Sequence, residues 1–123
     1  LDGGLLTGKY RRGQAPPEGS RLAKWKERYA KFDTEQSWKI VDALVGVAEE
    51  MGKPPSQVAL AWLLSKPVVS SVIFGARSLA QLDENLGAGE LDLPADAIAK
   101  LDAAGDLAVG EPYDFIRDVN GSW

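Results

Sequence analysis

The stretch VVSSVIFGARSLAQLDEN, residues 68–85, decides the fold that we predict for this chain. Residues 68–74 form a short, apolar, β-branched run between Pro67 and Gly75, which is typical of a strand covered on both faces in a parallel sheet. A parallel strand needs neighbours on both sides, and this chain does not supply them. We therefore expect either a piece of a larger α/β domain or a chain that pairs with another chain.

Helical patterns surround this predicted strand. Apolar residues at three- and four-residue steps form one stripe before Gly52, and Pro55 suits the first turn of a nearly all-apolar helix that we expect to be deeply buried. Ser78 and Gln81 predict a capping box for the helix after the strand. The predicted helices cover roughly residues 35–51, 55–66, 79–88 and 94–105.

The turn after the predicted strand is a candidate anion site, because a glycine turn that leads into a helix N-terminus presents backbone N–H groups. Arg77 in this turn can offer a forked, permanently charged donor set to a phosphate. Gln81, Glu84 and Asn85 share one face of the following helix and suit a purine and a ribose phosphate. The alternative is a plain helix start, with Gln81 as a cap and the other side chains in solvent.

A second candidate is GGLLTGKY, residues 3–10, which matches most of the phosphate-binding pattern G-x-x-x-x-G-K. Tyr10 stands where that pattern requires a Ser or Thr hydroxyl for magnesium. The helix that should follow cannot begin there, since Pro16 and Pro17 come soon afterwards. The stretch is therefore a weak indication of an NTPase.

Composition excludes several kinds of site. The chain has no cysteine and no histidine, which excludes disulfides, thiolate metal sites, Cys nucleophiles, His-dependent triads and HExxH zinc sites built from this chain alone. We expect no metal site. No apolar run approaches the ~20 residues of a membrane span, and no secretory leader is apparent. We expect a cytoplasmic location.

Charge is distributed unevenly along the chain. Residues 1–40 hold nine Lys and Arg against five Asp and Glu, whereas residues 41–123 hold five against thirteen. The basic first segment can attract a phosphate-bearing ligand, or it can be a solvated basic linker. The acidic remainder argues against nucleic-acid binding, which needs many phosphate contacts.

Several motifs occur together in one order along almost the whole chain. They are LDGGLLTGKY at residues 1–10, GQAPPEGSRLA at 13–23, QVALAW at 57–62, VIFGARSLAQLDEN at 72–85 and PYDFI at 112–116. With them the chain resembles the C-terminal part of an aldo-keto reductase, in particular the branch of bacterial reductases and potassium-channel β-subunits. Asp2 stands where that family often has Ala, and Pro54 where it usually has Ser or Thr as a helix cap.

The resemblance implies the C-terminal portion of a (β/α)₈ TIM barrel of ~300 residues, helix-rich with one or two parallel strands in this chain. Residues 1–123 would form one cofactor-binding part of that barrel. Its segments would be a phosphate loop and basic clamp loop (1–34), two helices (35–66), the last strand with its turn and helix (68–88), and the final helix with the C-terminal tail (89–123).

The resemblance also implies an NADP(H) site across the barrel rim. The phosphate loop would wrap the pyrophosphate, Arg21 would reach over the cofactor as part of a clamp, and Arg77 would pair with the 2′-phosphate. The implied cofactor-binding residues are Leu1, Gly3, Gly4, Leu5, Thr7, Lys9, Arg21, Gly75, Ala76, Arg77, Gln81, Glu84 and Asn85. The tail from Tyr113 to Trp123 resembles the loop that narrows the family's substrate pocket.

The implied activity is hydride transfer between a nicotinamide cofactor and a small aldehyde or ketone. The family's catalytic Asp, Tyr, Lys and His belong to the earlier part of the barrel, so no catalytic residue is expected here, and this chain alone is expected to be inactive without the N-terminal barrel portion. One alternative is a non-catalytic NADP(H)-binding regulatory subunit of the same fold. Another is a free-standing helical interaction domain, which predicts no NADPH affinity.

Overall fold

The computed structural model describes residues 1–106 together with residues 116 and 119. The predicted substrate-pocket loop, Tyr113–Trp123, lies outside the described residues except at these two positions. The described elements are η1 (Asp2–Thr7), α1 (Arg21–Lys24), α2 (Lys26–Phe32), α3 (Glu35–Met51), α4 (Pro55–Leu64), α5 (Leu79–Leu86), η2 (Gly87–Glu90) and α6 (Ala95–Gly105).

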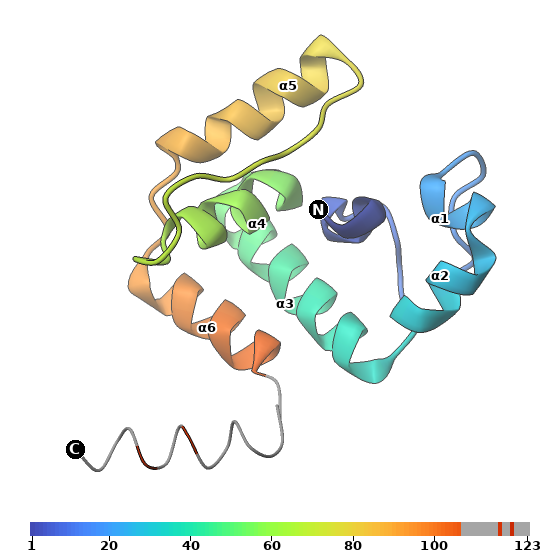
Figure 1. Cartoon of the computed structure of the whole chain (residues 1–123), viewed down its shortest axis with the longest axis horizontal. Coiled ribbons are helices and arrows are strands. Elements are labelled where there is room, and N and C mark those ends of the chain that lie inside the picture. The colour runs from blue at the N-terminus through green and yellow to red at the C-terminus, as the bar shows by residue number, and fades with distance from the viewer. Residues whose placement is uncertain (107–115, 117–118, 120–123) are drawn as a thin grey trace.

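Helices α3, α4 and α6 form the centre of the molecule, with α5 on one side and α1 and α2 on the other (Figure 1). The 3₁₀ helix η1 lies between these two sides and contacts α1, α3 and α4. No helix within the described ranges is long and apolar enough to cross a membrane.

Helix α3 has the predicted bounds, because strong local signals mark both of its ends. The Thr34 hydroxyl oxygen accepts a hydrogen bond from Ser37 N at 3.2 Å, and Gly52 ends the helix in the left-handed conformation with φ 61°. The predicted apolar stripe faces inward and includes buried Val41 and Leu44. Its packing against α4 and α6 forms the core.

Helix α4 begins at Pro55 as predicted, but its burial is uneven. Val58, Leu60 and Ala61 are buried, whereas Leu63 and Leu64 in the last turn are exposed. The prediction of a deeply buried helix is therefore correct for the first turns and wrong for the end. Apolarity around the whole helix indicates burial only where other elements cover every face, and the outer side of the last turn, with Leu63 and Leu64, stays exposed in the described structure.

The predicted strand over residues 68–74 is not a strand in the part of the chain that the structure describes. Val72 and Phe74 pack on the core beside α4 and η2, but Ile73 between them is 97% exposed. The segment therefore has the alternation of a strand without the neighbour whose hydrogen bonds would make it one. The prediction of a parallel strand covered on both faces is wrong for this structure, which is helical.

The predicted helix over residues 79–88 is divided into α5 and η2. Ser78 Oγ accepts from Gln81 N at 3.2 Å, as the capping box requires. In a complete capping box the Gln81 side chain would also accept from the backbone N–H of Ser78. Here Gln81 Oε1 accepts instead from Arg77 N, one residue earlier, at 2.9 Å. Helix α6 ends at Gly105, as predicted.

Asp102 joins the end of α4 to α6. Its carboxylate accepts from Trp62 Nε1 at 2.7 Å and forms an ion pair with Lys66. The hydrogen bond from Lys66, followed by that from Trp62, lowers the pKa of Asp102 below its usual value. A carboxyl with a lowered pKa stabilises the fold fully above its unfolded pKa, and this contribution is lost as the pH falls through the folded pKa.

We expect Asp102→Asn to lower the denaturation midpoint at pH 7 and to have a much smaller effect at about pH 2, below the usual carboxyl range. Urea unfolding at both pH values tests this, with Asp92→Asn as the control at an exposed carboxylate on the η2–α6 connection. An equal loss at both pH values would contradict a role for the charged form.

Candidate cofactor site

The loop formed by η1 is built on positive φ angles. Gly3 has φ 67°, Gly4 has φ 96° and Gly8 has φ 75°, a region that L-residues other than glycine rarely adopt. A Cβ atom on Gly4 would lie 2.8 Å from Lys9 Nζ, so the ammonium group rests directly over this glycine. The loop thus brings a cation close to glycine backbone, and these are groups that a phosphate can use.

Thr7 and Leu5, two further predicted phosphate-loop residues, are occupied within the protein. Thr7 Oγ1 donates to Gly4 O at 2.7 Å, so its one hydroxyl proton can reach a phosphate only after that bond breaks. The Leu5 side chain is buried beside Tyr10 and Leu22, which leaves only its backbone for a ligand. Tyr10 OH in turn accepts from Leu22 N at 3.3 Å and joins the loop to α1.

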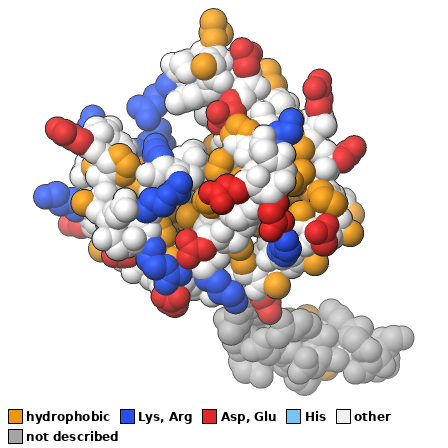
Figure 2. Space-filling view, turned by 180° about the vertical axis from the view of Figure 1, so that it is seen from behind, with side chains coloured by type: hydrophobic (Ala, Val, Ile, Leu, Met, Phe, Trp, Pro, Cys, Tyr) orange, Lys and Arg blue, Asp and Glu red, His pale blue; other side chains and the backbone are white. Residues whose placement is uncertain are grey.

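Arg21, the predicted clamp residue, lies at the exposed start of α1. Its guanidinium group lies 5.5 Å from the centroid of the Trp25 ring, and that of Arg28 lies 5.7 Å from the same ring. Arg28 also pairs with the carboxylate of Asp2 at 3.4 Å. Lys and Arg side chains gather on the side formed by α1 and α2 (Figure 2). The sequence interpretation gave Trp25 and Arg28 no role at this site, because the helix is interrupted at Trp25 and leaves no continuous periodic pattern.

The predicted adenosine end is only partly accessible. Gly75, Ala76 and Arg77 are exposed, but Gln81 Oε1 is engaged by Arg77 N, so the cap occupies the oxygen that a ligand would also use. Asn85 is buried, with 5% of its surface exposed. Arg77 is therefore the best-presented charged group at this end.

The first turn of α4 contacts both ends of the predicted site. A Cβ atom on Gly8 would lie 2.8 Å from Pro55 Cγ, so the phosphate loop packs directly on this turn. The next residue, Ser56, donates from its hydroxyl to Glu84 Oε1 on α5. The sequence interpretation treated Pro55 only as a helix start and missed Ser56, because neither contact leaves a periodic pattern.

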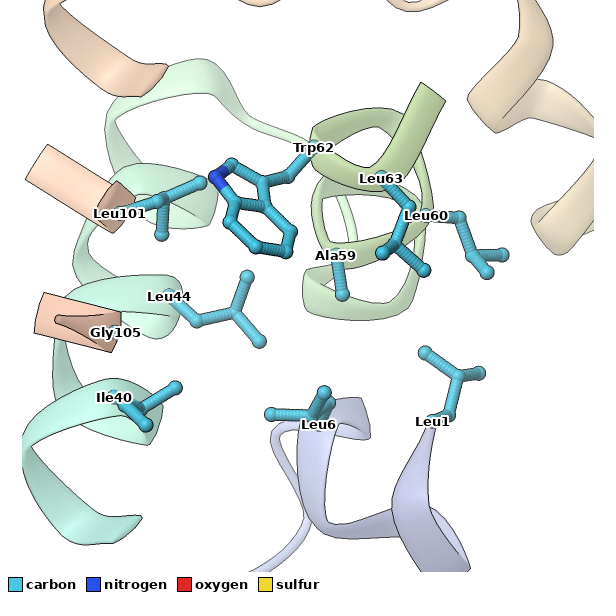
Figure 3. A pocket seen from close by; sticks show the side chains of 10 residues that line it. All are labelled: Leu1, Leu6, Ile40, Leu44, Ala59, Leu60, Trp62, Leu63, Leu101 and Gly105. Carbon is cyan, nitrogen blue, oxygen red and sulfur yellow. The ribbon is translucent and has the colours of Figure 1, made fainter. Parts of the chain in front are cut away.

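An apolar cavity of about 270 Å³ lies between η1, α3, α4 and α6 (Figure 3). Trp62 and Leu63 from α4 and Leu44 from α3 line it, and among the predicted cofactor residues only Leu1 does so. Its walls carry almost no polar group, so they have nothing with which to bind a pyrophosphate. The cavity is therefore not a phosphate-binding site.

The sequence profile described as "Aldo/keto reductase family" matches residues 1–106 of this chain. The chain belongs to the aldo/keto reductase family. The resemblance inferred from the motifs is thereby confirmed, and the family's fold is a (β/α)₈ barrel of which this chain presents a helix-rich part.

Curated relatives of this aldo/keto reductase chain fall into more than one functional class. It is 38% identical over 100 residues to "Protein tas" of Escherichia coli K12, covering 81% of this chain and 28% of that protein. It is 36% identical over 104 residues to L-glyceraldehyde 3-phosphate reductase of Escherichia coli O157:H7, covering 80% and 30%.

A further relative is the Arabidopsis thaliana protein named "Probable voltage-gated potassium channel subunit beta", 40% identical over 90 residues, which cover 72% of this chain and 27% of that protein. The chain thus spans less than a third of the length of each of these three relatives. The family is shared by oxidoreductases and by proteins named for a channel.

Proposed function

We propose that this chain supplies the cofactor-binding part of an NADP(H)-dependent aldo/keto reductase that reduces a small aldehyde or ketone. The observation that carries the proposal is the first turn of α4, which holds the phosphate loop through Gly8 and Pro55 and holds α5 through Ser56 and Glu84. A dinucleotide is long, and its two charged ends need groups held at a constant separation.

The residues present fit this cofactor. Gly3 and Gly4 let the loop backbone approach a pyrophosphate closely, and Lys9 beside Gly4 offsets its charge. Arg21 on α1 closes over the loop as a clamp, since α1 contacts η1. Arg77 offers its guanidinium to the ribose 2′-phosphate at the other end.

The other contacts that we propose lie at the adenosine end of the cofactor. Gly75 and Ala76 leave the turn uncovered for the adenosine, and Gln81 keeps its amide N–H₂ for the ribose phosphate while its oxygen caps α5. Exposed Glu84 would contact the base, and Asn85, which is 5% exposed, would reach it only through a small part of its surface. When bound, the cofactor supplies a hydride to the carbonyl carbon. The acid that protonates the carbonyl oxygen comes from outside this chain, which is why catalysis needs the earlier barrel portion.

We expect the complete protein to bind NADPH and to reduce an aldehyde, and residues 1–123 alone to give no turnover. Cofactor fluorescence measures the binding, and loss of NADPH absorbance measures the reaction. Turnover by the purified 123-residue chain would contradict the proposal that this chain holds only the cofactor-binding part of the active site.

The same measurements separate the alternatives. A non-catalytic regulatory subunit would bind NADPH without turnover, and the relative named for a potassium channel is the observation that favours this second candidate. A free-standing helical interaction domain would not bind NADPH at all.

A further inference from the structure

We infer that Ser56 is a positioning residue that orients the Glu84 carboxylate toward the base of the cofactor and so favours a purine with a 6-amino group. The inference rests on the proposed function. Ser56 is 2% exposed, and its hydroxyl donates to Glu84 Oε1 across the α4–α5 contact. Glu84 is exposed and lies on the helix that follows the Arg77 turn.

The direction of this hydrogen bond is set by α4. Ser56 is the second residue of that helix, after Pro55, whose ring restricts the backbone and packs on Gly8. A buried hydroxyl without a partner costs about 1–3 kcal/mol, so the proton of Ser56 is held on its acceptor. Glu84 therefore adapts to Ser56, because the exposed side chain is the one that can rotate.

The separation between the two helices is also restricted at this point. A Cβ atom on Gly87, just after α5, would lie 2.4 Å from Nε2 of Gln57, the neighbour of Ser56. Asn85, next to Glu84, is buried against the protein. The end of α5 therefore cannot move far from α4, and the distance between Ser56 and Glu84 is maintained.

A carboxylate with one oxygen engaged by a hydroxyl has less freedom to rotate, and its second oxygen remains free to accept a hydrogen bond. The 6-amino group of adenine is a donor that such an oxygen can accept. Hypoxanthine has a carbonyl oxygen at that position, which a carboxylate repels. An oriented Glu84 would thus distinguish the two bases, whereas a freely rotating one would do so weakly.

The test uses the complete protein and two dinucleotides, NADPH and its hypoxanthine analogue, with dissociation constants measured by fluorescence. We expect Ser56→Ala to weaken NADPH about 5- to 10-fold and the analogue less than about 2-fold. Ser65→Ala is the matched control, because this serine lies at the other end of α4 and donates to Trp62 O. Thermal unfolding of each variant checks that the fold is retained.

A double variant makes the test specific. In a Glu84→Ala background, Ser56→Ala should cause no further loss of NADPH affinity, since the two side chains then act as one unit. Equal losses for both dinucleotides, or a full further loss in that background, would overturn the inference and leave the proposed function intact. If the unsubstituted protein binds neither dinucleotide, the proposed function is wrong and the inference fails with it.

Discussion

Replacing Arg77 with Glu is expected to weaken NADPH binding about 100-fold and NADH binding less than about 3-fold in the complete protein. The two cofactors differ only in the 2′-phosphate, so the difference between the losses isolates this one contact. The turn that carries Arg77 is fixed by the bond from its N–H to Gln81 Oε1, and its side chain is exposed. Glu at this position would place a negative charge against the phosphate dianion.

Dissociation constants for both cofactors, measured at one ionic strength, provide the comparison, because exposed charges are screened by salt. Lys39→Glu is the matched control, since it makes the same change of charge on α3, where Lys39 Nζ lies 3.5 Å from Ala103 O of α6. If Arg77→Glu weakens NADPH and NADH equally, the role at the 2′-phosphate is wrong.

Replacing Gly8 with Ala is expected to lower the free energy of unfolding by about 2–4 kcal/mol. Two effects add at this position. Alanine is strained at φ 75°, and its Cβ would lie 2.8 Å from Cγ of the rigid Pro55 ring. Relief of this clash would move the loop that carries Lys9, so NADPH affinity should fall as well.

Gly13→Ala separates the two effects. Gly13 has φ 71°, close to the φ of Gly8, but no heavy atom in the described part of the chain lies within 4 Å of its Cβ position. We expect a loss of only about 1–2 kcal/mol there. Urea denaturation of both variants gives the comparison. If the two variants lose the same free energy of unfolding, the close approach of position 8 to Pro55 does not add to the cost of the substitution.

Helices with strong local signals were predicted well from the sequence. The bounds of α3 follow from the Thr34 cap, the apolar stripe and the Gly52 stop, all of which act within a few residues. The start of α5 at Leu79, after the Ser78 cap, has the same origin. These signals depend on short-range sterics and hydrogen bonds, so neighbouring residues are sufficient to specify them.

The segment Val68–Phe74 shows the limit of such reasoning. Its β-branched residues favour an extended backbone, but the segment begins in a turn closed by Val69 N and Lys66 O, and a strand is defined by hydrogen bonds to a neighbour. The described part of the chain supplies no such neighbour, so Ile73 is exposed where the sequence indicated burial. Composition can indicate a preference for a sheet, but it cannot provide the partner.

Some candidate site residues could likewise be identified from the sequence, whereas the role of others depends on the structure. The glycines and Lys9 of the phosphate loop and Arg77 of the turn were identified from the sequence, because backbone freedom and charge are properties of single residues. For Gln81 the sequence left a cap and a ligand contact in competition. The structure assigns its Oε1 to the cap through Arg77 N, which leaves its N–H₂ group for a ligand.

The sequence by itself determined helices α3, α4, α5 and α6, but not η1, α1 and α2. It also determined the family and the candidate phosphate-binding groups, since each depends on local chemistry or on a motif read in order. Only the tertiary structure decided that Pro55 supports the loop at Gly8 and that Ser56 holds Glu84. These contacts join residues 47 and 28 positions apart in the sequence, and no local rule relates such residues. They exist because packing α4 between η1 and α5 buries apolar surface on both sides.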